Sequence, residues 1–212
     1  VLLTVSVYAE TPEEKGLAIA NEIDSRDKGF KDLTSNMLMV LKNRHGQEST
    51  RRIRMKAIEV DGDGDKSLTI FDTPKDVKGT AFLNFTHKKG DDDQWLYLPA
   101  LKRVKRISSR NKSGSFMGSE FSYEDLSAFN VKKYIYEGDA EILNIDGKKM
   151  YKIFSKPVSK YSGYTKLISF IDKDTFLVKK VEYYDRKKQL LKTAYFDKYN
   201  KIESVYRISG IT

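Results

Sequence analysis

The chain has 212 residues, enough for one domain of ordinary size, and 39% of them are hydrophobic, enough to bury a core. It contains no cysteine and two histidines, which excludes disulfides, thiolate zinc sites, cysteine nucleophiles and a three-histidine metal site built from this chain alone. With 39 Lys and Arg against 30 Asp and Glu, the net charge is +9. That excess favours an anionic partner, such as a nucleic acid, a membrane surface or an acidic protein.

Residues 1–9 read VLLTVSVYA and carry no charge, whereas charged residues begin at Glu10. Val7 and Ala9 fit the small-residue rule for signal-peptide cleavage loosely, so we expect residues 1–9 to be a signal-peptide remnant and 10–212 to be a single domain. The alternative is that residues 1–9 form a buried first strand. No later stretch approaches the roughly 18 apolar residues that a membrane helix needs.

A helix start is marked at Thr11-Pro12-Glu13-Glu14, which supplies an N-cap hydroxyl, a proline at the first helical position and a glutamate at the third. Leu17, Ala20 and Ile23 then recur at helical spacing. The pattern predicts a helix that runs to about Asp27 and stops at Gly29.

After Phe30 the hydrophobic period changes to two, as in the alternation of Ile53, Met55 and Ala57 with basic residues. Turn signals follow at short intervals, and about ten to twelve strands at this spacing predict an antiparallel meander folded as a sheet, a sandwich or a barrel. The later strands are expected at 81–85, 94–98, 131–136, 150–154, 166–171, 176–184, 190–196 and 202–208.

The stretch 108–125 breaks this rhythm, because it is rich in Ser and Gly and poor in β-branched residues. A loop of this length in a small domain is typically a lid or a binding loop. Phe116, Met117 and Phe121 need a place to bury, so we expect residues 108–126 to be a mobile flap whose apolar side chains plug a cavity. Replacing the two phenylalanines should then cost less than the roughly 3–5 kcal/mol of a packed core phenylalanine.

Three segments match known chemical motifs only in part. The acidic run from Asp61 to Asp72 has Lys66 where a calcium loop needs glycine, and hairpin-turn carboxylates explain it better. Its Gly64-Asp65-Lys66-Ser67 end lacks the glycine spacing of a phosphate loop. The serine in Gly114–Gly118 is not central, as a nucleophile elbow requires. We therefore expect no catalytic residue, metal or cofactor.

A basic run, Lys102-Arg103-Val104-Lys105-Arg106, could contact phosphates, with nearby aromatic residues stacking on bases. It also fits a cationic strand with Leu101 and Val104 turned inward. We prefer this second interpretation, in which Lys102, Arg103, Lys105 and Arg106 meet solvent, anionic headgroups or a partner, and we expect no nucleic acid.

Residues 94–107 (QWLYLPALKRVKRI), together with 116–126 (FMGSEFSYEDL) and 70–83 (IFDTPKDVKGTAFL), resemble the bacterial outer-membrane lipoprotein-sorting proteins related to the carriers LolA and LolB. The resemblance extends over residues 11–212. Family members usually continue with further strands, so we expect this chain to be truncated at its C-terminal end.

The resemblance implies a mainly β (α+β) fold: a strongly curved, incompletely closed antiparallel half-barrel, with an N-terminal helix and a lid segment covering an apolar cavity. It implies a monomeric periplasmic carrier for lipid or lipoprotein acyl chains, without catalytic residues. An inner-membrane transporter and an outer-membrane acceptor would be its partners, with peripheral membrane contact. The side chains expected at the cavity and lid are Met37, Met39, Met55, Trp95, Tyr97, Phe116, Met117, Phe121 and Leu126.

Two other functions stay open at this point. The first is a lipid-active hydrolase built on the same cavity, which would need a nucleophile. The second is a cationic β protein with a filled core that binds a membrane surface or a partner.

Export makes a direct prediction. Protein secreted from a bacterial host should begin at Glu10 when its N-terminus is sequenced, because the uncharged stretch ends at Ala9. An uncleaved N-terminus would contradict the expected export.

Overall fold

The computed structural model describes residues 11–212, so the expected signal-peptide remnant lies outside the described residues. Helix α1 (Pro12–Arg26) begins as predicted: the Thr11 side chain accepts a hydrogen bond from the Glu14 amide, and the Glu14 carboxylate accepts one from the Thr11 amide. Asp27 caps its C-terminal end. Within residues 11–212, no helix combines the length and apolar character needed to cross a membrane.

Six strands form the first sheet, and each pairs antiparallel with the next in the order β1 to β6. This confirms the predicted meander, because consecutive hairpins place sequence neighbours side by side. The strands are β1 (Asp32–Lys42), β2 (Glu48–Ile58), β3 (Lys66–Thr73), β4 (Ala81–Phe85), β5 (Asp93–Leu98) and β6 (Arg103–Ile107).

The second sheet has the order β11-β10-β9-β8-β7 and is again antiparallel throughout. A separate hairpin, β12 with β13, follows it. The strands are β7 (Tyr134–Ile145), β8 (Lys148–Pro157), β9 (Tyr164–Asp172), β10 (Val178–Asp185), β11 (Leu190–Tyr195), β12 (Lys198–Ile202) and β13 (Val205–Gly210).

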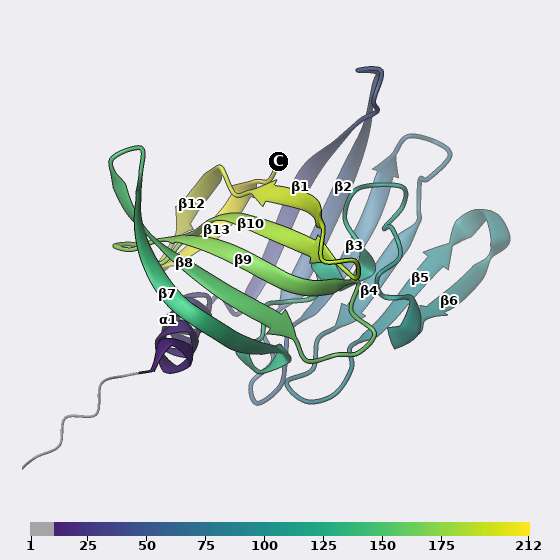
Figure 1. Cartoon of the computed structure of the whole chain (residues 1–212). Helices are drawn as coiled ribbons and strands as arrows, with labels where there is room; N and C mark the ends of the chain where they lie inside the picture. The colour runs from purple at the N-terminus through teal and green to yellow at the C-terminus, as the bar shows by residue number, and fades with distance from the viewer. Residues whose placement is uncertain (1–10) are drawn as a thin grey trace, which may run out of the picture.

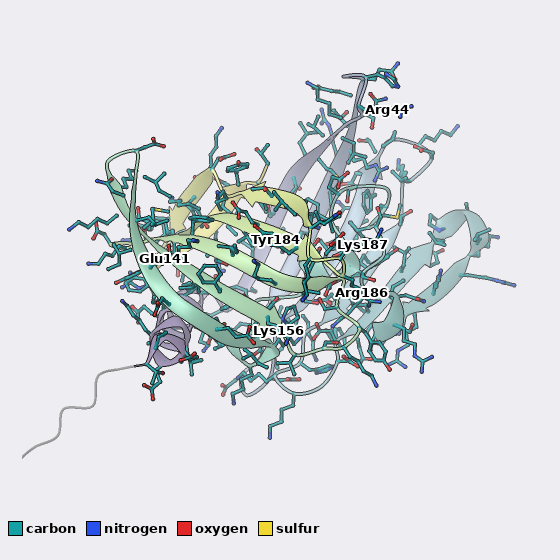
Figure 2. All side chains as sticks on the ribbon, viewed as in Figure 1. Arg44, Glu141, Lys156, Tyr184, Arg186 and Lys187 are labelled. Carbon is teal, nitrogen blue, oxygen red and sulfur yellow. The ribbon has the colours of Figure 1, made fainter. Side chains whose placement is uncertain are left out.

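Figure 1 shows the second sheet, green to yellow, curving in front of the first, blue to teal, with α1 beneath β7 and the β12–β13 hairpin at one end. The sheets do not close into a barrel, so the architecture is the expected open, curved half-barrel. Helix α1 lies against β7 so closely that a Cβ on Gly16 would sit 3.3 Å from the Cβ of Tyr136. The β1–β2 hairpin projects from the rest of the molecule, with Arg44 at its tip (Figure 2).

Three local expectations were wrong. The strand predicted at 202–208 is the turn and second arm of a hairpin, since Glu203 has a left-handed φ of 53° between β12 and β13. Residues 131–133 form a short 3₁₀ helix before β7 begins. Leu101 and Val104 do not turn inward: they are 63% and 64% exposed, because β6 is the edge strand of its sheet and little packs over it.

Each sheet has its own core. In the first sheet, Ile53, Phe71, Phe82 and Leu96 pack together with Phe116. In the second sheet, a cluster that includes Tyr136, Ile153 and Ile171 packs against Ile19 and Ala20 of α1. Each sheet therefore packs its inner face against its own partner, either the segment between β6 and β7 or α1, and space remains between the two sheets.

The connecting segment, residues 108–133 between β6 and β7, is fastened to both sheets. On the first sheet, Gln94 donates to the backbone oxygen of Tyr123 at 2.8 Å, and Phe116 is only 1% exposed. On the second, Glu124 accepts from the Gly163 amide at 2.7 Å, and the Asp125 carboxylate pairs with the Lys192 ammonium.

Phe116 is thus a packed core residue rather than a plug for a cavity. Its ring lies 5.2 Å from that of Phe82, 5.7 Å from that of Tyr123 and 5.8 Å from that of Phe71, between centroids. Met117 and Phe121 are half-buried against the same cluster. The sequence expectation missed this because the aromatic partners lie far apart in the chain.

We predict that Phe116→Ala lowers the free energy of unfolding by about 3–5 kcal/mol, as for a fully packed phenylalanine. Phe121→Ala, at a half-buried position of the same segment, is the matched control and should cost clearly less. Urea unfolding followed by circular dichroism measures both, and equal small losses would show that Phe116 is not part of the core.

Candidate functional site

A cavity of about 1040 Å³ lies between the two sheets. Both sheets, the C-terminal end of α1, the connecting segment and the β12–β13 hairpin contribute to its wall. Much of the wall is apolar and comes from β1, β2, the connecting segment, β8 and β9, through Leu33, Met55, Ala57, Leu126, Ile153 and Leu167. This volume lies at the upper end of the range for small-molecule pockets in proteins.

Two of the nine side chains expected at the cavity or lid, Met55 and Leu126, line it. Met37 and Met39 share the inner face of the first sheet with Met55, since Met37 pairs with Ile53 and alternate residues of a strand face the same side. They lie further along the strands, where Met39 packs against the core that holds Phe116 and Met37 is exposed.

Trp95 and Tyr97 lie on the opposite face of the first sheet. In β5 the buried residues are Gln94 and Leu96, so the residues that alternate with them point outward. The Trp95 ring packs edge-on against Phe85 with centroids 5.3 Å apart. The alternation was visible in the sequence, but the choice of inner face was not, because both faces of β5 carry apolar side chains.

The four basic residues at 102–106 are all exposed at one edge of the first sheet. Lys102 has a left-handed φ of 48° and precedes β6. Arg106 pairs with Asp93 of the neighbouring strand. Together with the exposed Leu101 and Val104, they form a cationic edge, defined here as residues 101–106.

One opening of the cavity is marked by side chains that line it and are also exposed to solvent, among them Lys88, Lys132 and Lys160. Around it, the segment after β4 meets the connecting segment, since the Ala128 amide donates to Thr86 and the Asn130 side chain to the His87 carbonyl. Lys133 pairs there with Asp92. The opening therefore carries cationic and polar side chains beside the exposed Phe129 and Val158, whereas the interior is largely apolar.

Sequence reasoning missed a group of tyrosines that line the cavity from the second sheet and from β12: Tyr134, Tyr136, Tyr164, Tyr183 and Tyr199. Burial raises the pKa of all five phenols far above the usual value, so they stay protonated and able to donate hydrogen bonds. Tyr134 and Tyr136 are two positions apart in β7, so the sequence places them on one face of the strand. The neighbouring residues do not show whether that face is the inner one.

The wall where β9 meets the connecting segment contains a connected polar cluster. The Tyr164 hydroxyl donates to Asp125 Oδ1 at 2.8 Å and lies 3.1 Å from Ser122 Oγ. Glu124 accepts from Ser162 Oγ and the Gly163 amide, and burial raises its pKa in spite of these bonds. The polar atoms are mutually satisfied, so this cluster positions the wall.

The acidic run 61–72 and the two histidines hold surface structure together. Asp72 pairs with Arg54, and His87 lies between Asp63, 2.8 Å from its Nδ1, and Asp93, 3.2 Å from its Nε2. Within residues 11–212, no group of three His, Asp or Glu side chains could hold a metal ion. The ring of His45 accepts a hydrogen bond from Arg44.

Comparison with known proteins shows the family to which this chain belongs. A domain described as an outer membrane lipoprotein-sorting protein, from Vibrio parahaemolyticus, is 52% identical to this chain, with a TM-score of 0.91 over 94% of this chain and 84% of that one. The chain belongs to the LolA/LolB-like family of outer membrane lipoprotein-sorting proteins. A family model described as "uncharacterized protein" matches residues 63–212.

Two further structures agree with this LolA/LolB-like assignment. A DUF1329 family protein from Desulfovibrio piger is 33% identical, with a TM-score of 0.87 over 94% of this chain and 85% of that one. A LolA superfamily protein from Nitrosomonas europaea, 19% identical, shares the fold with a TM-score of 0.68 over 95% of this chain and 84% of that one.

One curated relative differs in kind. A tyrosine–tRNA ligase from Parabacteroides distasonis is 28% identical over 121 residues, and this chain spans 28% of that protein's length.

The pairing of His87 with Asp63 and Asp93 predicts that the stability of the protein depends on pH. Hydrogen bonds to Asp63 and then Asp93 raise the pKa of His87 above its usual value of 6.5. Because the folded pKa is raised, the stabilisation is fully present below pH 6.5 and is lost as the pH rises through the folded pKa.

The loss of stability in His87→Asn should therefore be larger at about pH 5.5 than at about pH 9. Urea unfolding of both proteins at the two pH values measures it. His45→Asn, at the exposed β1–β2 turn, is the control. A difference that does not change with pH would show that the imidazolium adds nothing to the fold.

Proposed function

We propose that this protein carries lipid or lipoprotein acyl chains through the periplasm towards the outer membrane. The observation behind the proposal is the cavity of about 1040 Å³, with apolar side chains from both sheets in its wall and cationic side chains at its opening. The family adds support, since the 52% identical structure is described as an outer membrane lipoprotein-sorting protein domain. An inner-membrane transporter would be the donor, and an outer-membrane protein the acceptor.

The energetics suit a carrier. Each methylene group moved from water into an apolar cavity contributes about 0.8 kcal/mol, so eight of them contribute about 6 kcal/mol before the entropic cost of binding. Of the cavity residues expected from the sequence, Met55 and Leu126 would contact the acyl chain directly. Met55 is unbranched and can adapt to different chains.

The cationic edge is the proposed contact with the anionic membrane surface. Lys102, Arg103 and Lys105 have exposed side chains, and Leu101 and Val104 are exposed between them. Such contact is weak and screened by salt, which suits a monomer that must leave one membrane for another. Binding to anionic vesicles that does not weaken with salt would contradict this role.

The two rival functions find less support. A hydrolase would need an activated nucleophile, but within residues 11–212 the hydrogen bonds of both histidine rings go to Arg44, Asp63 and Asp93 rather than to a serine. A surface-binding protein with a filled core is hard to reconcile with the cavity.

The carrier function is tested by the lipid that the protein retains. Protein purified from a Gram-negative host should yield intact acyl lipids on solvent extraction and mass spectrometry. Hydrolysis products in place of intact lipid would support the hydrolase, and the absence of bound lipid would support the filled-core alternative.

Ser169→Phe should reduce the bound lipid by at least about half, because Ser169 of β9 lines the cavity and a ring there occupies its volume. Ser49→Phe, at an exposed position of β2 outside the wall, is the control and should retain lipid. Melting temperatures of both variants check that each is folded. Equal lipid content in the two variants would show that lipid binds elsewhere.

A further inference from the structure

Two phenol groups in the cavity wall stand out because they lie deep in the protein and yet keep exposed surface. Burial is the main cause that raises the pKa of Tyr134 and Tyr183, so both phenols are surrounded by protein. Both side chains are nevertheless only partly buried, and both line the cavity. At least part of the exposed surface of each ring faces the cavity.

The two rings belong to one part of the wall. Tyr134 and Tyr183 both pack against the cluster of Tyr164, Leu167 and Val181. The Tyr164 and Tyr183 ring centroids are 5.0 Å apart. Tyr164 is held by its bonds to Asp125 and Ser122, so the wall behind the two phenols is fixed.

The hydroxyls differ in what they bind. That of Tyr164 is satisfied by Asp125, whereas those of Tyr134 and Tyr183 make no hydrogen bond with the described residues. A third phenol, Tyr136, is 6% exposed, lines the same cavity and has a hydroxyl without a partner in residues 11–212. Of these hydroxyls only that of Tyr136 is fully buried without a partner in that range; those of Tyr134 and Tyr183 keep accessible surface, so an acceptor on a ligand can take the place of water there.

The charges around the phenols select the kind of acceptor. Glu124, Asp125 and Asp92 all act on Tyr134 to disfavour further negative charge. Lys192 pairs with Asp125 and Lys133 with Asp92, which offsets part of this negative charge, and Lys88, Lys132 and Lys160 also line the cavity. An uncharged carbonyl oxygen can accept from the phenols without adding a charge beside these carboxylates.

We propose that the hydroxyls of Tyr134 and Tyr183 bind the carbonyl oxygen of an ester- or amide-linked acyl chain. This inference rests on the proposed carrier function and adds a selection for acyl chains that carry a carbonyl group over plain hydrocarbon. Tyr134 follows Lys132 and Lys133, which line the cavity at its opening, so the linkage would lie just inside the opening with the chain beyond it.

The test compares three ligands on the full chain: diphenylhexatriene, a fluorescent hydrocarbon without an acceptor, then monopalmitoylglycerol and palmitate as competitors. In the double variant Tyr134→Phe/Tyr183→Phe, the ester should bind about tenfold more weakly, because two hydrogen bonds are lost. Diphenylhexatriene should bind as in the wild type. Palmitate should lose less affinity than the ester in this variant, because the lysines that line the opening still meet its carboxylate.

Tyr151→Phe is the matched control, since Tyr151 packs in the second sheet but does not line the cavity. The two single variants show whether each hydroxyl contributes if the double variant melts early. An unchanged ratio of ester to hydrocarbon affinity in the variants would overturn the inference. If neither hydrocarbon nor ester bound the wild type, the carrier function itself would fail as well.

Discussion

The buried ion pair between Asp125 and Lys192 is the interaction on which the arrangement of the two sheets depends. It joins the connecting segment to β11, while Phe116, nine residues earlier in the same segment, is locked in the core of the first sheet. Removing one partner of such a pair is costly because a buried charge is left alone, although the pair itself adds little net stability. The pair therefore acts mainly by fixing the position of the connecting segment against β11, which holds the two separately packed sheets apart. The cavity is the space that lies between them.

That separation explains why the cavity can be apolar and tyrosine-lined at the same time. The strands of the second sheet alternate, so Leu167 of β9 lines the cavity from one face beside Tyr164, while Ile168 and Phe170 pack with Met150 on the other. A fully closed sheet of this size would fill its interior with side chains, as small barrels do. Because the connecting segment joins the two sheets along one side and a cavity remains between them, the inner faces are left partly uncovered, and a ligand can complete their packing.

The sequence predicted the local structure well and the long-range structure less well. The capping box at Thr11 and the period-two alternation around Ile53 depend on neighbouring residues, so both could be interpreted without the fold. Phe116 could not, since its burial depends on Phe71 and Phe82, more than thirty positions away. For Trp95, the alternation of side chains along β5 was predictable, but which of the two faces points inward was not. Met55 was correctly placed at the cavity, while the tyrosines were missed because a phenol in a strand is equally common on a solvated face.

The edges of the two sheets bear on how the protein behaves at high concentration. An open sheet presents unpaired backbone groups along its outer strands, and these can pair with another copy of the chain. Here β6 is short and carries basic side chains on the strand itself, so two such edges repel each other. At the other sheet, Thr212 covers part of the outer edge, since its amide and carbonyl pair with those of Tyr195 at the end of β11. The basic residues proposed to meet a membrane therefore also disfavour pairing of the β6 edge with another copy of the chain.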